Sequence, residues 1–559
     1  MQVLTLATAS ALAGLLVACA QPARLPEPRA LVAPAAVGLA TSAPTELVAS
    51  TWWQELGDTR LDALVEQALA EQPRLQIAAA RLEQARIQSR LAGTAGEVQI
   101  GLNADATLQR YTAHGLVPPP IAGTWQTSAN VMVGANWEID FWGRHGAALA
   151  QALGGERAAR ADMAAARTLL AAEVARAYIA LAQAGSAADN ARQALTQREA
   201  IARLTQERVK AGLDTQGELA LSNARVADAR GQVLAVMERQ TLLRHQLAAL
   251  SAQAPQALDA LAPTLAALKL AAAPVATSLP AATGTSRFAA TAEARPGAGA
   301  ASTATTATPG STHPAHVTSA VVGADLLGRR ADLAAARGRV EAAVQGVTVA
   351  RGRFYPDLNL NVFAGLSALG LDKLVDIGSR TYGAGPALRL PLFDTPGLNA
   401  QLGSRAAEYD AAVAAYNAAV IDAARAAADA LALRSSLAGQ ITQQADALAQ
   451  ANEAWRIART RYDAGLSGYL QVLAADDLRL AQERAATDLR ARALDAQVQL
   501  MHALGGGWDA GELAPMPAPS ASAVTRPAST VASNAALVAT AATPPAPPRA
   551  ATEHASPTP

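Results

Sequence analysis

The stretch Thr124–Arg144, TWQTSANVMVGANWEIDFWGR, alternates between two kinds of side chain along its length. Its odd positions read Trp, Thr, Ala, Val, Val, Ala, Trp, Ile and Phe, and its even positions are mostly polar. Successive side chains of a β-strand point to opposite faces, so this pattern predicts a long strand with one apolar and one polar face.

Three further segments alternate in the same way, so the predicted strands are 98–109, 125–141, 357–365 and 381–393. A lipid-spanning strand needs ~9–11 residues with such alternation. The alternative is a half-buried sheet of a soluble protein. Aromatic residues are only 4% of the chain, so little other core is available, and lipid is the favoured contact of the apolar faces. Pro386 and Pro391 make the fourth strand the weakest prediction, because each removes a ladder donor.

Long alanine-rich segments surround these strands, and the one proline in them, Pro73, is near the start of a helical segment, where it is tolerated. An amphipathic helix leads into each strand pair, a long helix follows, and a second helix returns after a Gly turn. A helix of ~65 residues would be ~100 Å long, which exceeds a globular domain. The predicted helices are 59–92, 145–210 and 215–251, then 326–351, 398–463 and 468–504.

The same order of elements occurs twice, and short motifs recur with it. RVKAGL at 208–213 returns as RYDAGL at 461–466. A seven-residue ladder follows each copy and predicts side-by-side coiled-coil packing. The ladders are Leu219, Val226, Val233, Gln240 and Leu247, and Leu473, Leu480, Thr487, Leu494 and Met501. We interpret 51–265 and 323–508 as two internal repeats.

Two hairpins cannot close a barrel, and an open sheet edge in hydrocarbon leaves backbone groups unsatisfied. The strands must therefore pair with other copies of the chain. Two copies give eight strands and a filled interior, and three give twelve strands with a water-filled lumen. Polar inner positions favour three: Gln99, Asn103, Asn130, Asn136, Asn359 and Asn361. The helices alone would also fit free antiparallel coiled coils.

The N-terminus has the pattern of an export signal. Residues 3–18 form a short apolar run, and LVAC places a small residue before Cys19, as in a bacterial lipobox. We interpret 1–18 as a signal peptide, Cys19 as the acylated residue and 19–50 as a Pro-rich tether. The alternative is a signal peptide with an incidental cysteine.

Two segments are too low in complexity to bury a core, an insert at 266–322 and a tail at 509–559, and we expect both to be disordered. The formal net charge is zero, so the chain lacks the basic surplus that is typical of nucleic-acid-binding proteins. The seven histidines show no metal-ligand spacing, and no catalytic motif is present. We expect no enzyme activity, metal or cofactor.

Several motifs, weak singly but specific in order, resemble the TolC-like outer-membrane efflux family in its NodT-type lipoprotein branch. The resemblance covers residues 16–508 apart from 271–320. Its marks, besides Cys19, are WWQELGDTRLDALVEQAL (52–69), NWEIDFWGR (136–144), LLGRRADLAAARGRVEAA (326–343), RFYPDL (353–358), LRLPLFD (388–394), RYDAGLSGYLQVL (461–473) and LGGGW (504–508).

The resemblance implies a mainly α protein with membrane β-structure. Three protomers would form a twelve-stranded outer-membrane β-barrel over a periplasmic α-barrel of long antiparallel helices. It also implies a lipid-anchored homotrimer in the outer membrane that reaches into the periplasm. There it would dock on a periplasmic adaptor protein served by an inner-membrane RND-type transporter.

By this likeness the tip turns, Gly212–Leu213 and Gly465–Leu466–Ser467, would contact the adaptor. Family members often carry acidic residues just after the second turn, as a constriction ring. Here those places hold Gln471 and Ala474, and Asp476 and Asp477 follow instead. Asp214 in the first turn is another gate candidate, although a solvated loop aspartate is the plainer interpretation.

The function we predict is a passive exit duct of a tripartite pump for small molecules such as drugs, toxic organics or metal ions. Two alternatives remain open: a type I protein-secretion duct, and a pore-less coiled-coil protein that bridges the envelope. The sequence does not name the substrate.

Overall fold

The computed structural model describes residues 23–33, 36, 48–270, 329–391 and 393–508. The chain divides into a unit of residues 1–510 and a unit of residues 511–559, and every described residue belongs to the first. The proposed signal peptide, Cys19, most of the insert and the C-terminal tail lie outside the described residues.

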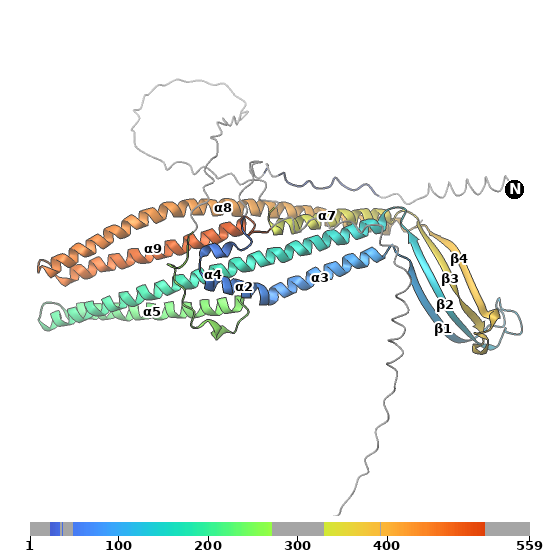
Figure 1. The fold of residues 1–559 in the computed structure, drawn as a ribbon, viewed down its shortest axis with the longest axis horizontal. Coiled ribbons are helices and arrows are strands. Elements are labelled where there is room, and N and C mark those ends of the chain that lie inside the picture. Colours follow the sequence, from blue (N-terminus) through green and yellow to red (C-terminus); the bar gives the residue numbers. More distant parts are fainter. Residues whose placement is uncertain (1–22, 34–35, 37–47, 271–328, 392, 509–559) are drawn as a thin grey trace, which may run out of the picture. The chain divides into compact units, whose positions relative to one another are not determined.

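Helices dominate the fold, and the strands form one sheet (Figure 1). The first half contains η2 (Trp52–Leu56), α2 (Thr59–Glu71), α3 (Pro73–Thr94), β1 (Gln99–Arg110), β2 (Trp125–Ile139), α4 (Arg144–Lys210), α5 (Gln216–Leu250) and η3 (Pro255–Leu258). The second half contains α7 (Ala331–Gly352), β3 (Asp357–Leu369), η4 (Leu371–Lys373), η5 (Ile377–Ser379), β4 (Arg380–Arg389), α8 (Thr395–Asp463) and α9 (Tyr469–Ala503).

The two halves have matching lengths as well as a matching order. Each strand pair follows a helix of 22 residues, α3 or α7. The strands lead into helices of 67 and 69 residues, α4 and α8. Each of these then reverses into a return helix of 35 residues, α5 or α9.

Some predicted boundaries were wrong. The helix expected over 59–92 is two helices, because Gln72 has extended backbone and Pro73 occupies the first turn of α3. The fourth strand ends at Arg389 rather than 393, two residues before Pro391. The third strand continues to Leu369, beyond the predicted 365, and the second ends at Ile139.

The sheet has four antiparallel strands in the order β1-β2-β3-β4. Its register places the predicted apolar positions of all four strands on one face. Leu102 pairs with Val133, Trp137 with Leu360, and Leu358 with Leu388. The alternation predicted from the sequence is therefore present in the structure, and many of these apolar side chains are exposed in the single protomer.

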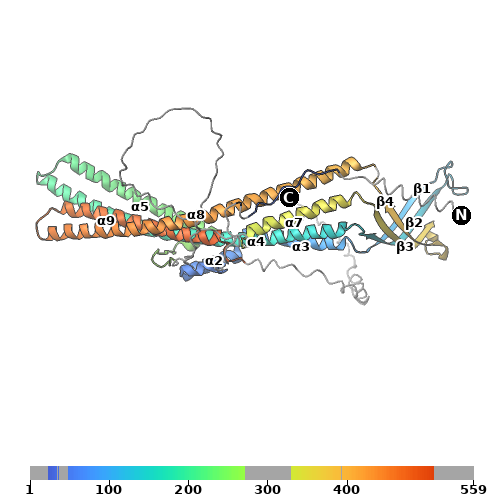
Figure 2. The same ribbon diagram turned by 90° about the horizontal axis from the view of Figure 1, so that it is seen from above.

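The helices pack as antiparallel pairs. Figures 1 and 2 both show α5 beside α4 and α9 beside α8, and α4 also contacts α3, α7 and α9. The predicted ladders lie on the packed faces, since Val226, Leu247, Leu480 and Leu494 are buried. A Cβ on Gly154 would come within 2.9 Å of the Ala342 backbone, so α4 and α7 approach closely.

The largest core cluster fills the middle of the helical region. Trp52, Leu61, Tyr178, Leu247 and Leu494 are all at most 2% exposed within it. Leu268 is 1% exposed in the same cluster, so the packed part of the first half continues past residue 265. Among the described residues, none of the helices combines the length and apolar character that crossing a membrane requires.

Candidate functional site

The second face of the sheet carries a row of polar side chains that bond across strands. The amide of Asn130 in β2 donates to Asp105 Oδ2 in β1 over 3.0 Å. The hydroxyl of Ser367 in β3 donates to Asn130 Oδ1 over 2.7 Å. These contacts connect side chains of three strands in one continuous hydrogen-bonded row, on a solvent-accessible face.

The polar face also carries apolar side chains, of which the sequence analysis placed Met132, at an even position of the second strand, but missed Phe363. Phe363 and Met132 lie there by register, because Phe363 pairs with Gly134 and Met132 pairs with Asn103. The parity of the strand pattern would have located Phe363 as well. Their surroundings depend on cross-strand register, which the sequence does not supply.

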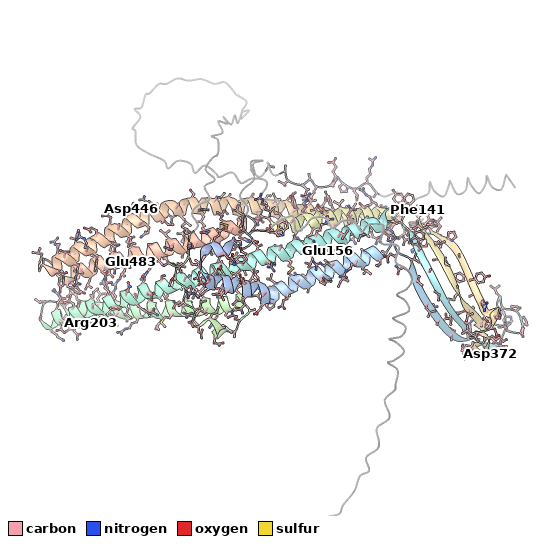
Figure 3. The ribbon with its side chains drawn as sticks, viewed as in Figure 1. Phe141, Glu156, Arg203, Asp372, Asp446 and Glu483 are labelled. Carbon is pink, nitrogen blue, oxygen red and sulfur yellow. The ribbon has the colours of Figure 1, made fainter. Side chains whose placement is uncertain are left out.

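Several hydrogen bonds hold the connection between β2 and α4. Asp140 caps α4, accepting from the backbone N–H groups of Arg144 at 2.7 Å, His145 at 3.0 Å and Gly146 at 3.1 Å. The indole of Trp142 donates to the Pro356 carbonyl over 2.9 Å. This connection lies beside Phe141, labelled where the helices meet the strands in Figure 3, whereas Asp372 marks the opposite end of the sheet.

The hairpin turns lie at the ends of α4 and α8 that are away from the sheet (Figure 1). Gly212 and Gly465 have φ values of 72° and 71°, a left-handed conformation that ends a helix without strain only for glycine. Leu213 and Leu466 follow them and are 66% and 72% exposed. The two turns therefore present equivalent apolar side chains.

The two turns differ in the residue after this leucine. In the first, Arg208 donates to both oxygens of Asp214 at 2.8 Å, and these bonds lower the pKa of the Asp214 carboxyl. In the second, Ser467 takes the place of Asp214, and within the described part of the chain its hydroxyl has no hydrogen-bond partner. Asp214 thus has a structural role in its turn.

The two other acidic gate candidates, Asp476 and Asp477, also have ion-pair partners. Asp476 lies 2.7 Å from Arg479 of its own helix, whereas Asp477 lies 3.2 Å from Arg198 of α4. Gln471 is exposed and takes no part in these two ion pairs. The structure therefore brings Asp476 and Asp477 next to guanidinium groups and leaves Gln471 apart.

A row of polar contacts connects α4 with α9 at intervals of seven residues. Arg176 contacts Asp495 at 2.6 Å, and the Gln183 amide donates to Asp488 at 2.8 Å. The Gln197 amide donates to the Leu473 carbonyl at 2.7 Å. Asn190 stands between them in this series, and its buried amide nitrogen has no partner among the described residues. These contacts join the α4–α5 pair to the α8–α9 pair, which we call the two helical hairpins.

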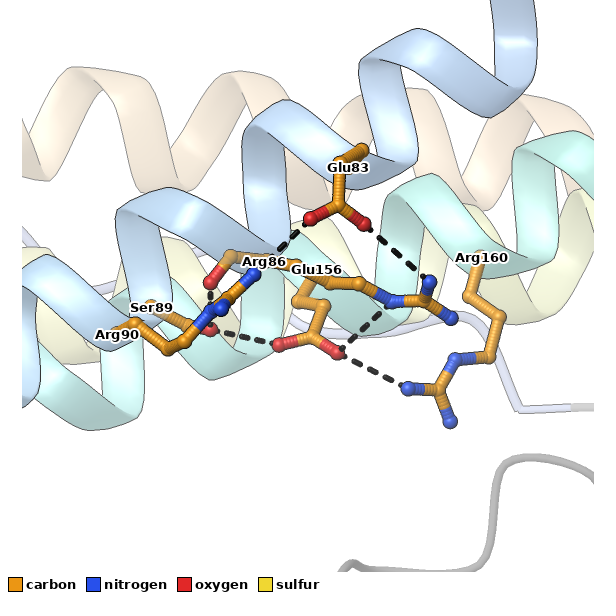
Figure 4. A network of polar contacts seen from close by, with 6 residues as sticks. All are labelled: Glu83, Arg86, Ser89, Arg90, Glu156 and Arg160. Atoms are coloured by element: carbon orange, nitrogen blue, oxygen red, sulfur yellow. Dashed lines mark hydrogen bonds and ion pairs between the residues drawn. The ribbon is translucent and has the colours of Figure 1, made fainter.

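A second polar network joins α3 and α4 (Figure 4). The Glu156 side chain is only 9% exposed, and it accepts from Ser89 Oγ at 2.7 Å and Arg160 at 2.9 Å. Arg86 lies 3.9 Å from the same carboxylate. Removing one partner of such a buried charge is costly, so these contacts hold α3 against α4.

The N-terminal residues 23–33 lie along α8. The backbone N–H groups of Ala23 and Val32 donate to the side chains of Asn399 and Asn417 at 2.8 and 2.9 Å. Between them, the N–H of Arg29 donates to Asp410 at 3.1 Å. The nine residue steps from Ala23 to Val32 would cover ~28 Å in a polyproline II conformation. The eighteen residues from Asn399 to Asn417 rise ~27 Å in an α-helix, so the two lengths match.

Within the described residues, His, Cys, Asp and Glu side chains do not gather in threes as metal ligands would. The described residues form a two-faced sheet connected to long paired helices.

Comparisons with known proteins agree. The family model "Outer membrane efflux protein" matches residues 64–253 and 322–506. The multidrug resistance outer membrane protein MdtQ of Escherichia coli O6:H1 is 29% identical over 82% of this chain and 88% of that protein. MdtP of Escherichia coli strain K12 is 28% identical over 82% of this chain and 87% of that protein. The crystal structure of the outer membrane protein VceC from Vibrio cholerae superposes with a TM-score of 0.69 at 32% identity, covering 82% of this chain and 100% of the VceC chain. This chain belongs to the outer membrane efflux protein family.

Proposed function

We propose that the protein is the outer-membrane exit duct of a tripartite efflux pump and passes small molecules. One observation carries the proposal: a single sheet has an apolar face, a polar face and two edge strands, β1 and β4, that pair with no further strand in the described part of the protomer. In hydrocarbon such edges must be paired, so the sheet requires copies of itself.

A homotrimer meets this requirement. Three copies of a four-stranded sheet would supply twelve strands, with β1 of each protomer next to β4 of its neighbour. Twelve strands enclose a lumen rather than a filled core. The apolar face would contact lipid and the polar face would line the lumen. The long helices would continue the conduit into the periplasm as an α-barrel built from the two repeats.

The N-terminal segment supports a lipid anchor at Cys19. Ala23 is bonded to Asn399, about one turn into α8, and the sheet ends shortly before that helix. Four residues of chain reach at most ~14 Å, so an acyl group on Cys19 would lie near the helix-proximal end of the sheet. That position suits anchoring in the leaflet facing the periplasm.

The hairpin turns are the proposed adaptor contact. Gly212, Leu213, Gly465, Leu466 and Ser467 form two equivalent tips with exposed leucines. Opening would move the hairpins apart, which would break the contacts between α4 and α9. Asp477 is the best gate candidate because its ion pair with Arg198 crosses between the hairpins, whereas Asp476 and Asp214 pair within their own hairpins, and Gln471 takes no part.

The relatives favour small molecules over secreted proteins, since MdtQ and MdtP are named multidrug resistance proteins. The partners would be a periplasmic adaptor and an inner-membrane RND-type transporter.

Two measurements test the proposal. The purified trimer should conduct ions in planar bilayers, and deletion of the gene should increase sensitivity to drugs. A trimer that inserts but never conducts, together with unchanged drug sensitivity, would support the envelope-bridging alternative. Loss of a secreted protein with unchanged drug sensitivity would support the secretion duct.

A further inference from the structure

One cross-strand row on the polar face differs from the rest. Gly101 of β1 pairs with Gly134 of β2, Gly134 pairs with Phe363 of β3, and Phe363 pairs with Gly383 of β4. Three of these four positions have no side chain, and the fourth is a phenyl ring that is 41% exposed. The row therefore places bare backbone beside a single aromatic ring.

The rows on either side turn this bare backbone into a hollow of about 520 Å³, which we call the glycine hollow. Gln99 and Asn136 lie in the row on one side, and Asn103 and Met132 lie in the row on the other. The residues lining the hollow include no charged side chain. Its floor is hydrogen-bonded strand backbone, and its rim is amide, thioether and phenyl.

The space above Gly101 and Gly134 is open, because a side chain added at either position would meet almost no other atom. A Cβ on Gly101 would meet nothing within 4 Å, and one on Gly134 would meet only the Val362 carbonyl oxygen at 4.0 Å. Gly383 differs: a Cβ there would lie 2.7 Å from Phe363 Cζ. The phenyl ring thus rests over Gly383, at the β4 side of the hollow.

Asp105 follows Asn103 two positions along β1, so their backbones lie about 7 Å apart on the same face. The Asp105 carboxylate accepts from the amides of Asn103 at 3.3 Å and Asn130 at 3.0 Å, both of which are neutral. Within the described residues, Asp105 is not part of an ion pair, so its charge is not cancelled by a guanidinium or ammonium group. The field near the hollow favours a cation.

We propose that the glycine hollow is a transient binding subsite for the aromatic ring of amphipathic organic cations passing through the duct. The ring would stack on Phe363 and contact Met132, rim amides would bond its polar substituents, and Asp105 would attract its charge. The proposal rests on the proposed function, because it requires the polar face to line the lumen. A trimer would carry three such subsites.

The test uses single-channel recording of the purified trimer in planar bilayers with ethidium as the probe. Ethidium should cause brief current blocks, whereas tetraethylammonium, a cation without rings, should cause none. Phe363→Leu keeps an apolar side chain but removes the ring, and it should shorten the ethidium blocks about tenfold, equal to about 1.4 kcal/mol. Asp105→Asn should lower their frequency about fivefold, because the attraction of a single carboxylate is modest in water.

A filling variant has a matched control. Gly101→Leu places a side chain in the hollow and should abolish the blocks. Gly385→Leu adds the same side chain to the same face, again with nothing within 4 Å of its Cβ, but outside the residues that line the hollow. It should leave the blocks unchanged.

Ethidium fluorescence with the detergent-solubilised trimer gives an equilibrium readout that does not depend on insertion into a bilayer. The proposal is overturned if channels conduct normally but ethidium blocks and binding survive both Phe363→Leu and Gly101→Leu, or if tetraethylammonium blocks equally well. Absence of conductance in the wild-type protein, together with unchanged drug sensitivity on gene deletion, would instead refute the duct itself, and fluorescence would then show whether the hollow still binds the dye.

Discussion

The guanidinium of Arg198 in α4 lies 3.2 Å from the carboxylate of Asp477 in α9, and this ion pair crosses between the two helical hairpins. Both side chains are about one-third exposed, at 30% and 37%, so the pair contributes at most about 1 kcal/mol. We expect Asp477→Asn to raise the open probability of single channels by up to about fivefold, with a smaller effect at high salt.

Asp463 supplies the matched control for this change. It lies 3.2 Å from Arg459, but both residues belong to α8, so the pair does not join the hairpins. Asp463→Asn should leave the open probability unchanged. Equal effects of the two variants would show that the crossing pair does not hold the closed state.

Adjacent residues of β1 test which face of the sheet meets lipid. Leu102 is 70% exposed on the apolar face, and an arginine there would cost about 2–4 kcal/mol in the middle of a bilayer. Leu102→Arg should therefore reduce the amount of SDS-resistant trimer in outer-membrane fractions. Asn103→Arg places the same charge on the polar face and should assemble normally. If both variants assembled equally, the apolar face would not be the lipid contact.

His502 makes stability depend on pH. Burial, and then the positive charge of Arg330, lowers the pKa of His502 below 6.5, while Asp332 opposes this and Arg176 reinforces it. The unfolded chain binds a proton at higher pH than the folded chain does, so stability falls as pH drops below 6.5. Thermal unfolding between pH 5 and 8 should show this loss, and His502→Gln should flatten it. A curve of the same shape in the variant would assign the loss to other groups.

The Tyr178 hydroxyl donates to the buried carboxylate of Asp58 over 2.6 Å, and Asp58 also caps α2. Tyr178→Phe leaves that carboxylate oxygen short of a donor, which should cost about 1–3 kcal/mol. Circular dichroism on heating should show a lower unfolding temperature. Tyr416→Phe is the control, because within the described residues its hydroxyl makes no hydrogen bond while its side chain packs against the cluster of Leu333, Val420 and Ala423.

Sequence patterns predicted the strands and helices because backbone geometry sets their periods. A period of two placed Leu102 and Asn103 on opposite faces, and the structure has them there. The seven-residue ladder likewise placed Leu247 and Leu494 on packed faces. The break at Gln72 was missed although Pro73 signals it: a proline in the interior of a helix removes a hydrogen bond, whereas in the first turn of a new helix it is tolerated.

The side-chain partners could not be predicted in the same way. Whether Asp477 meets Arg198 depends on the rotation of two helices that lie far apart in the sequence, and no local pattern encodes that rotation. The glycine hollow depends on a register that aligns Gly101, Gly134 and Phe363 across three strands. Asp214 was recognised as a loop aspartate, but its bidentate bonds to Arg208 needed the turn geometry.

The N-terminal segment braces the sheet-proximal part of α8. From Asn399 to Asn417 a strip of chain is bonded to the helix through its backbone, and Leu25 packs on the small cluster that contains Phe354 and Leu402. Deleting residues 23–33 would remove these bonds and this packing, so α8 should bend more easily over that stretch.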